Sequence, residues 1–164
     1  MNSAIESLQQ RLAVLEAQSD IRRLLARYMD FCDVPHAPTQ VADLAALFAA
    51  DAIWEGVGAD AEQTFGRQQG RQAVAEFVAS YLPPASHFSL NLHFLTSELL
   101  QVDESASRAS GQWIMQQISS YTEGGSELIS ARLNIDFVCV DGQWYIAHFR
   151  TCRLFHSPLG EAAR

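Results

Sequence analysis

The chain has 164 residues, a length that suits one domain over residues 1–164, and its 48% hydrophobic and 18% charged content is ordinary for a globular protein. Its net charge of -8 argues against nucleic-acid binding, which relies on clustered Lys and Arg. No apolar run approaches the roughly 20 residues that span a bilayer, so we expect no membrane contact. The three cysteines, an odd number without Cys-x-x-Cys spacing, fit a reducing cytoplasm and argue against a zinc site.

The N-terminus predicts a helix over about residues 4–32. Apolar residues recur at steps of three and four from Ile5 to Leu15, and the stripe resumes one step later at Ile21. We therefore expect a break near Ser19 and Asp20, with residues 1–18 forming a helical arm that packs on a partner subunit.

Shorter elements follow. The prolines after Asp33 end the first helix, and apolar spacing predicts a second helix over 41–50. Residues 52–58 are typical of a strand closed by glycines, the polar segment 59–70 is expected to be a loop, and 71–82 is expected to be a helix.

The second half is typical of long strands, expected over residues 88–102, 107–121, 127–140 and 143–155. Tight turns between them, including Asp141-Gly142, predict an antiparallel meander. The fold class is therefore α+β, with a cone-shaped, curved antiparallel sheet wrapped around the N-terminal helices. Large apolar residues on both alternations of 109–118 mean that both faces need cover, which predicts a homo-oligomer, either a dimer or a trimer.

Several stretches carry a resemblance to a known family: IRRLLARYMDFCD (21–33), DLAALFAADAIWEGVG (43–58), LHFLTSELLQV (92–102), RLNIDFVCVDGQWYIAHFR (132–150) and CRLFHSPLG (152–160). In order and spacing they resemble the SnoaL-like branch of the nuclear-transport-factor-like superfamily, whose fold is a cystatin-like α+β barrel. Its enzymes include dehydratases and dehydrochlorinases, which remove a carbon-bound proton and expel a leaving group without a cofactor.

The resemblance implies particular site residues. Asp33, at the end of the first helix, and His93, at the start of a long strand, fall on the positions of the catalytic Asp and His. Tyr28 and Trp54 fall at pocket positions. The family's arginine on the last strand aligns with Phe149, one residue before Arg150.

The residue types fit proton abstraction. A neutral imidazole, with a reference pKa of ~6.5, can accept a proton near neutral pH, and a carboxylate on its other nitrogen fixes the tautomer. The alternatives are structural: His93 as a core histidine, Asp33 as a solvated turn residue, and Tyr28 as packing. Trp54, Trp113 and Phe149 would line a pocket or pack the core equally well. Arg132, Asn134 and Asp136 alternate with apolar residues and face either the pocket or a partner.

The leading hypothesis is a cofactor-independent lyase or isomerase acting on a small hydrophobic cyclic compound, with Asp33, His93 and Tyr28 as catalytic residues. Substrate-binding residues would be Trp54, Trp113, Asn134, Phe149 and Arg150. No His spacing or glycine-rich loop indicates a metal or nucleotide. The alternative is a non-catalytic ligand-binding or assembly module of the same fold, such as a dioxygenase β-subunit.

Overall fold

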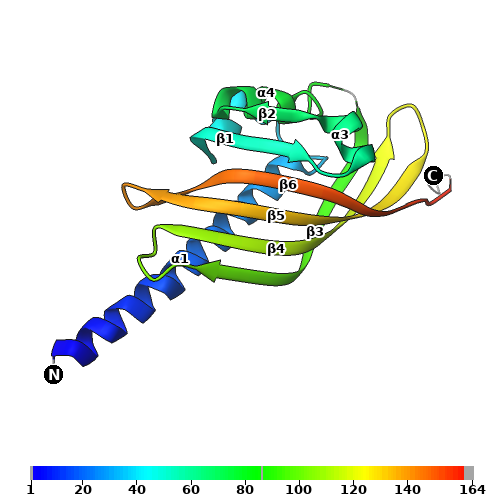
Figure 1. Ribbon diagram of the computed structural model, residues 1–164. Helices are drawn as coiled ribbons and strands as arrows, with labels where there is room; N and C mark the ends of the chain where they lie inside the picture. The colour runs from blue at the N-terminus through cyan, green and yellow to red at the C-terminus, as the bar shows by residue number, and fades with distance from the viewer. Residues whose placement is uncertain (1, 86, 161–164) are drawn as a thin grey trace.

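A six-stranded sheet with the strand order β2-β1-β6-β5-β4-β3 dominates the computed structural model, which describes residues 2–85 and 87–160 (Figure 1). Its last four strands form the predicted antiparallel meander: β3 (Phe88–Val102), β4 (Arg108–Tyr121), β5 (Ser126–Val140) and β6 (Gln143–Pro158). The α+β prediction is confirmed, with a sheet that is curved and not closed into a barrel.

The sheet is not wholly antiparallel, which corrects one detail of the prediction. Strand β1 (Phe48–Gly56) lies beside β6 and runs parallel to it. Nearly ninety residues of chain separate the two strands. A parallel pair needs a crossover of about a dozen residues or more, because a tight hairpin turn reverses the direction.

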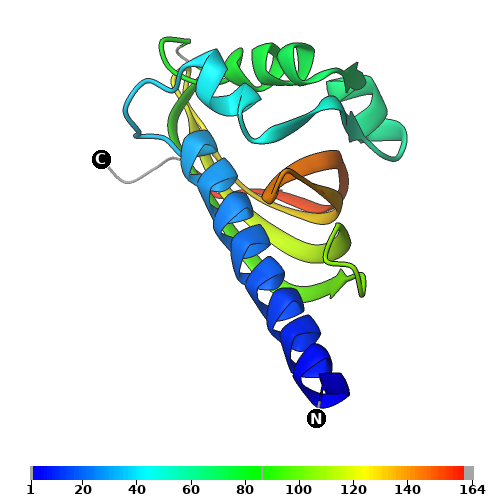
Figure 2. The ribbon, with the colours of Figure 1, turned by 90° about the vertical axis from the view of Figure 1, so that its left-hand side faces the viewer.

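Helix α1 (Asn2–Cys32) is continuous, so the predicted break near Ser19 and Asp20 is wrong (Figures 1 and 2). The shift of the apolar stripe marks a change in which face is covered. From Ala17 onward the inward face packs in the core, with Ile21 and Leu25 buried, whereas the stripe from Ile5 to Leu15 is exposed.

The segment between α1 and the meander is more structured than expected. Helix α2 is short (Val41–Ala45), because residues 48–50 already belong to β1. The expected loop over 59–70 contains helix α3 (Ala59–Phe65) and strand β2 (Arg67–Gln69), followed by α4 (Arg71–Ala79). Gly58, Gly66 and Gly70 all have positive φ, so the glycines that suggested a loop in fact separate short elements.

The two faces of the sheet have different roles. On β5, Leu133, Ile135 and Phe137 are buried against the helices, while the alternate residues point to the opposite face, which we call the outer face. Among the described helices, none is long and apolar enough to span a membrane.

Candidate active site

Asp33 and His93 are brought together by a two-residue bridge that follows α1. The backbone N–H of Val34 donates to the Asn91 carbonyl oxygen at 2.8 Å, and the Asn91 N–H donates back at 2.9 Å. This bridge ties the end of α1 to β3. Because Asp33 precedes one bridge partner and His93 lies two residues beyond the other, their side chains meet.

One carboxylate oxygen of Asp33 accepts hydrogen bonds from both the backbone and the ring of His93. Asp33 Oδ1 accepts from His93 Nδ1 at 2.8 Å and from the His93 backbone N–H at 3.0 Å. An ionised carboxylate only accepts, so a neutral imidazole carries its proton on Nδ1 and leaves a lone pair on Nε2. No described residue hydrogen-bonds to Nε2, and the His93 side chain is 10% exposed. In a core histidine of the structural alternative, the ring nitrogens would bond only to backbone carbonyl oxygens, whereas here Nδ1 bonds a carboxylate.

His93 lines a cavity of about 310 Å³ on the inner face of the sheet. The cavity lies between the sheet and helices α3 and α4, and its walls are largely apolar and aromatic, including Phe65, Tyr81, Phe88, Met115, Tyr121 and Ile129. A space of this kind suits a small, largely apolar ligand. Asp33 is not part of the described lining, so its contact with the cavity is indirect, through His93.

Gln117 lies directly across from His93 in the β3–β4 register and also lines the cavity. Asn91 Nδ2 donates to the Cys32 carbonyl, which turns Asn91 Oδ1 toward Gln117 and Ser119. Gln117 Nε2 then donates to Asn91 Oδ1 and to Ser119 Oγ, at 2.9 Å each. Both amide hydrogens are used, and Gln117 Oε1 has no partner in the described part of the chain, so it is a fixed acceptor beside His93.

Tyr28 is buried one layer behind this cavity. Its hydroxyl accepts from Trp54 Nε1 at 3.0 Å. Cys32, one helical turn later on α1, lines the cavity. Burial is the main reason that the pKa of Tyr28 lies well above its usual value and that the pKa of Cys32 rises to about 12. Both groups therefore stay protonated at neutral pH, which makes Cys32 a poor nucleophile.

The other expected aromatic residues pack in the core. The rings of Trp54 and Phe149 stack with centroids 5.5 Å apart, and both side chains are buried outside the described cavity lining. Trp113 lies under α1 instead, where its Nε1 donates to Glu98 at 3.3 Å.

Asn134 and Arg150 lie on the outer face, away from the cavity. They are register partners on β5 and β6, and they point opposite to Leu133 and Thr151 because strand residues alternate in direction. Arg132 and Asp136 lie on the same outer face, so all three polar residues of this alternating set point away from the cavity.

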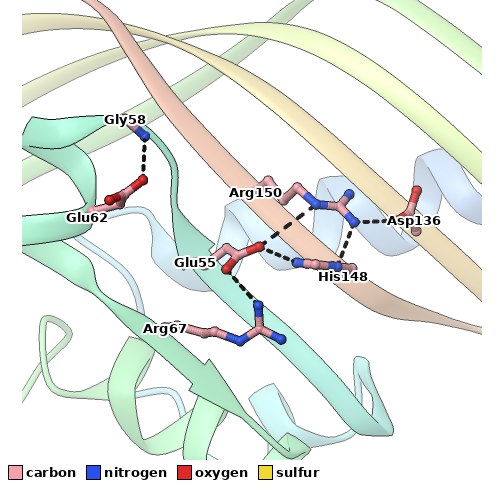
Figure 3. Close-up of polar contacts among 7 residues, drawn as sticks. All are labelled: Glu55, Gly58, Glu62, Arg67, Asp136, His148 and Arg150. Atoms are coloured by element: carbon pink, nitrogen blue, oxygen red, sulfur yellow. Dashed lines mark hydrogen bonds and ion pairs between the residues drawn. The ribbon is translucent and has the colours of Figure 1, made fainter.

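Arg150 belongs to a charged cluster on that face (Figure 3). It donates to Asp136 at 2.9 Å and to His148 Nδ1 at 2.6 Å, while His148 Nε2 contacts Glu55 at 2.7 Å. Arg67 contacts the other Glu55 oxygen at 3.1 Å. The cluster therefore ties together β1, β2, β5 and β6. In the residues described, no three His, Cys, Asp or Glu side chains converge as a metal ion would require.

Gln117 and Asn91 were missed by sequence reasoning. Next to the turn Val102 pairs with Ala109, a register that would place residue 118 opposite His93. An irregularity between Thr96 and Leu99 shifts the ladder by one residue and brings Gln117 there, and no turn signal in the sequence predicts it. The role of Asn91 depends on the Cys32 carbonyl, a backbone group whose position no side-chain pattern indicates.

Comparison with known proteins agrees with this fold. The model of the SnoaL-like domain family matches residues 13–150. A hexachlorocyclohexane dehydrochlorinase, LinA type 2, superposes with a TM-score of 0.75 at 21% identity, covering 92% of this chain and 93% of that one. LinA type 3 from Novosphingobium barchaimii LL02 gives 0.74 at 20% identity, covering 92% and 94%.

A putative scytalone dehydratase from Novosphingobium aromaticivorans DSM 12444 gives a TM-score of 0.71 at 21% identity, covering 91% of this chain and 97% of that one. At these identities the likeness establishes the fold alone. No curated protein sequence matches the chain significantly.

Proposed function

Because the chain belongs to the SnoaL-like domain family, whose model matches residues 13–150, we propose that it is a lyase in which His93 is the general base. The observation that carries the proposal is the Asp33–His93 pair beside a largely apolar cavity that His93 lines. With Nδ1 bonded to the carboxylate, a neutral imidazole has its lone pair on Nε2. The dehydrochlorinase and dehydratase names of its structural neighbours are consistent with elimination chemistry.

The proposed reaction is an elimination that needs no cofactor. His93 Nε2 takes a proton from a carbon next to an electron-withdrawing group, and the C–H electron pair forms a carbon–carbon double bond as the neighbouring carbon loses its leaving group. When hydroxide leaves, the imidazolium returns the proton and water departs. Asp33 holds the imidazole in its tautomer and stabilises the imidazolium. An isomerase would use the same base and return the proton to a different carbon.

The substrate class follows from the cavity. Its volume of about 310 Å³ and aromatic walls favour a small hydrophobic ring compound. Gln117 Oε1 offers one acceptor next to the base and favours a substrate with a hydroxyl group near the carbon that loses its proton. We propose a hydroxylated cyclic compound, with dehydration as the reaction.

The experiment is a screen of cyclic hydroxy and halo compounds for elimination without added cofactor, followed by variants of the pair. We expect Asp33→Asn and His93→Ala each to lower kcat by about 10²–10⁴-fold. The double variant should be no worse than the poorer single one, because the two residues act as a unit. Asp33→Glu, which keeps the carboxylate, should restore part of the activity.

The matched control is Asp30→Asn. Asp30 forms an exposed pair with His36, with 3.4 Å between Asp30 Oδ2 and His36 Nε2, so its loss should leave turnover unchanged. Circular dichroism checks that every variant folds. Near-normal kcat in either single variant contradicts the proposal. Compounds that bind without being turned over would instead favour the ligand-binding module.

A further inference from the structure

The first half of α1 carries an apolar stripe that the rest of the chain leaves uncovered. The N-terminal end of α1 extends beyond the edge of the sheet (Figures 1 and 2), and we call residues 4–18 the N-terminal arm. Its four large aliphatic side chains are 50% to 62% exposed: Ile5, Leu8, Leu12 and Leu15. We propose that the arm pairs in parallel and in register with the same arm of a second copy of the chain.

The stripe points away from the chain's own sheet. With Ile5 as position a of a heptad, the four residues occupy a, d, a and d, and the opposite side of the helix is position f. Both f residues face the molecule itself: the Gln10 side chain donates to the Glu104 carbonyl oxygen, and Ala17 is 3% exposed. The chain therefore cannot cover its own stripe, and in a parallel pair each folded body lies on the outside of the two arms.

The flanking charges select the partner and the direction. Arg11 is at position g and Glu16 at position e, five residues later. In a parallel, in-register pair, each g residue meets the following e residue of the other helix, which joins Arg11 to Glu16 twice. An antiparallel pair centred on the stripe would place the two Arg11 side chains together. Isoleucine at the first a position with leucine at both d positions also favours two parallel strands.

The length of the stripe limits how strong the pairing is. At the next a, d and a positions stand Ser19, Arg22 and Ala26, so the seam spans only two heptads. An isolated helix of that length is marginal in water, but this one continues into the docked half of α1 and is already nucleated. We therefore expect reversible dimers that dissociate on dilution.

The test is sedimentation of the full chain over a range of micromolar concentrations. The wild type should approach twice the chain mass as concentration rises. Leu12→Gln should weaken this self-association by about 100-fold, because two buried leucines are lost per dimer. Arg11→Glu or Glu16→Arg alone should weaken it about tenfold, since two attractive pairs become repulsive.

The double variant Arg11→Glu/Glu16→Arg should restore wild-type association, because it exchanges the two charges. Glu6→Arg makes the same charge change as Glu16→Arg off the seam, at position b, and should change little. A chain that stays monomeric overturns the proposal. So does an assembly that tolerates Leu12→Gln, or one that the double variant fails to restore.

Discussion

A single oxygen of Asp33 fixes the orientation of the His93 ring. A negative charge at the C-terminal end of a helix is unfavourable by about 0.3–1 kcal/mol, yet Asp33 lies there. Two N–H groups of His93 offset this cost, one from the backbone and one from the ring. The same pair of bonds fixes the side chain in place and directs the free ring nitrogen toward the cavity.

Gln117 should determine the preference for a hydroxyl group. In Gln117→Leu the cavity loses its fixed acceptor at similar side-chain volume, so a hydroxylated substrate should bind about 5–10-fold more weakly, which is the value of roughly one hydrogen bond. A substrate analogue without that hydroxyl should bind the variant at least as well as the wild type. Comparison of KM or Kd for the two compounds checks this, and an equal loss for both would contradict it.

Tyr28→Phe should separate packing from chemistry. The change leaves the buried Trp54 N–H without its acceptor, which costs about 1–3 kcal/mol of stability. For a chain of this size, each kcal/mol lowers the melting temperature by about 2–4 °C. Because Tyr28 lies behind Cys32, we expect kcat to change by less than about tenfold. A 100-fold fall in kcat with unchanged melting temperature would instead support the direct role that the family resemblance implies.

At the scale of elements, the sequence predicts well what local signals control. Glycine-bearing and polar turns predicted all four meander strands to within three residues, because each hairpin sets its own register. The break in α1 was mispredicted because the shift of the apolar stripe has two possible causes. The helix can end there, or it can continue while a different face of it becomes buried, and the sequence pattern is the same in both cases. Asn134 and Arg150 point outward because the helices cover the other side of the sheet. The alternation of residues along a strand shows that two faces exist, but it does not show which face the helices cover.

Gly56 shows how one strand position supports the cavity. A Cβ atom there would lie 2.2 Å from the Ala61 carbonyl oxygen, so Gly56→Ala must push α3 away from β1. Since Ala61, Thr64 and Phe65 of α3 line the cavity, we expect a stability loss of about 1–3 kcal/mol together with weaker ligand binding. Urea denaturation and ligand titration measure both effects. Gln116→Ala, an exposed change on the outer face, is the control, and unchanged binding in Gly56→Ala would refute the link.

For the molecule as a whole, the excess of negative charge is partly compensated by specific pairs. Arg22 donates to both Glu98 oxygens, joining α1 to β3, and this contact is the main reason that the pKa of Glu98 is lowered. Burial raises the pKa of Glu55, but contacts with His148 and Arg67 lower it further than burial raises it. His156 chiefly lowers the pKa of Glu127. These carboxylates lie far apart in the fold, so their protonation weakens several element contacts together.

Acid should therefore destabilise the fold within a defined window. A carboxylate whose pKa is lower in the folded state adds stability that is complete above its unfolded value and is lost as the pH falls through its folded value. For these glutamates the loss starts near pH 4.5, the reference value, and continues below it. Asp103 extends the window, because the backbone N–H of Arg108 and neighbouring donors lower its pKa to about 2. The free energy of unfolding in urea should be nearly level from pH 7 to about 5 and then fall steeply toward pH 3.

Glu98→Gln should cost less than about 1 kcal/mol at pH 7, because Arg22 is half exposed, and its difference from the wild type should shrink as the pH falls. Glu123→Gln, in the exposed turn between β4 and β5, makes the same charge change and should leave the profile nearly unaltered. A profile that stays level down to pH 3, or a Glu98→Gln difference that grows in acid, would show that these pairs do not set the acid limit of the fold.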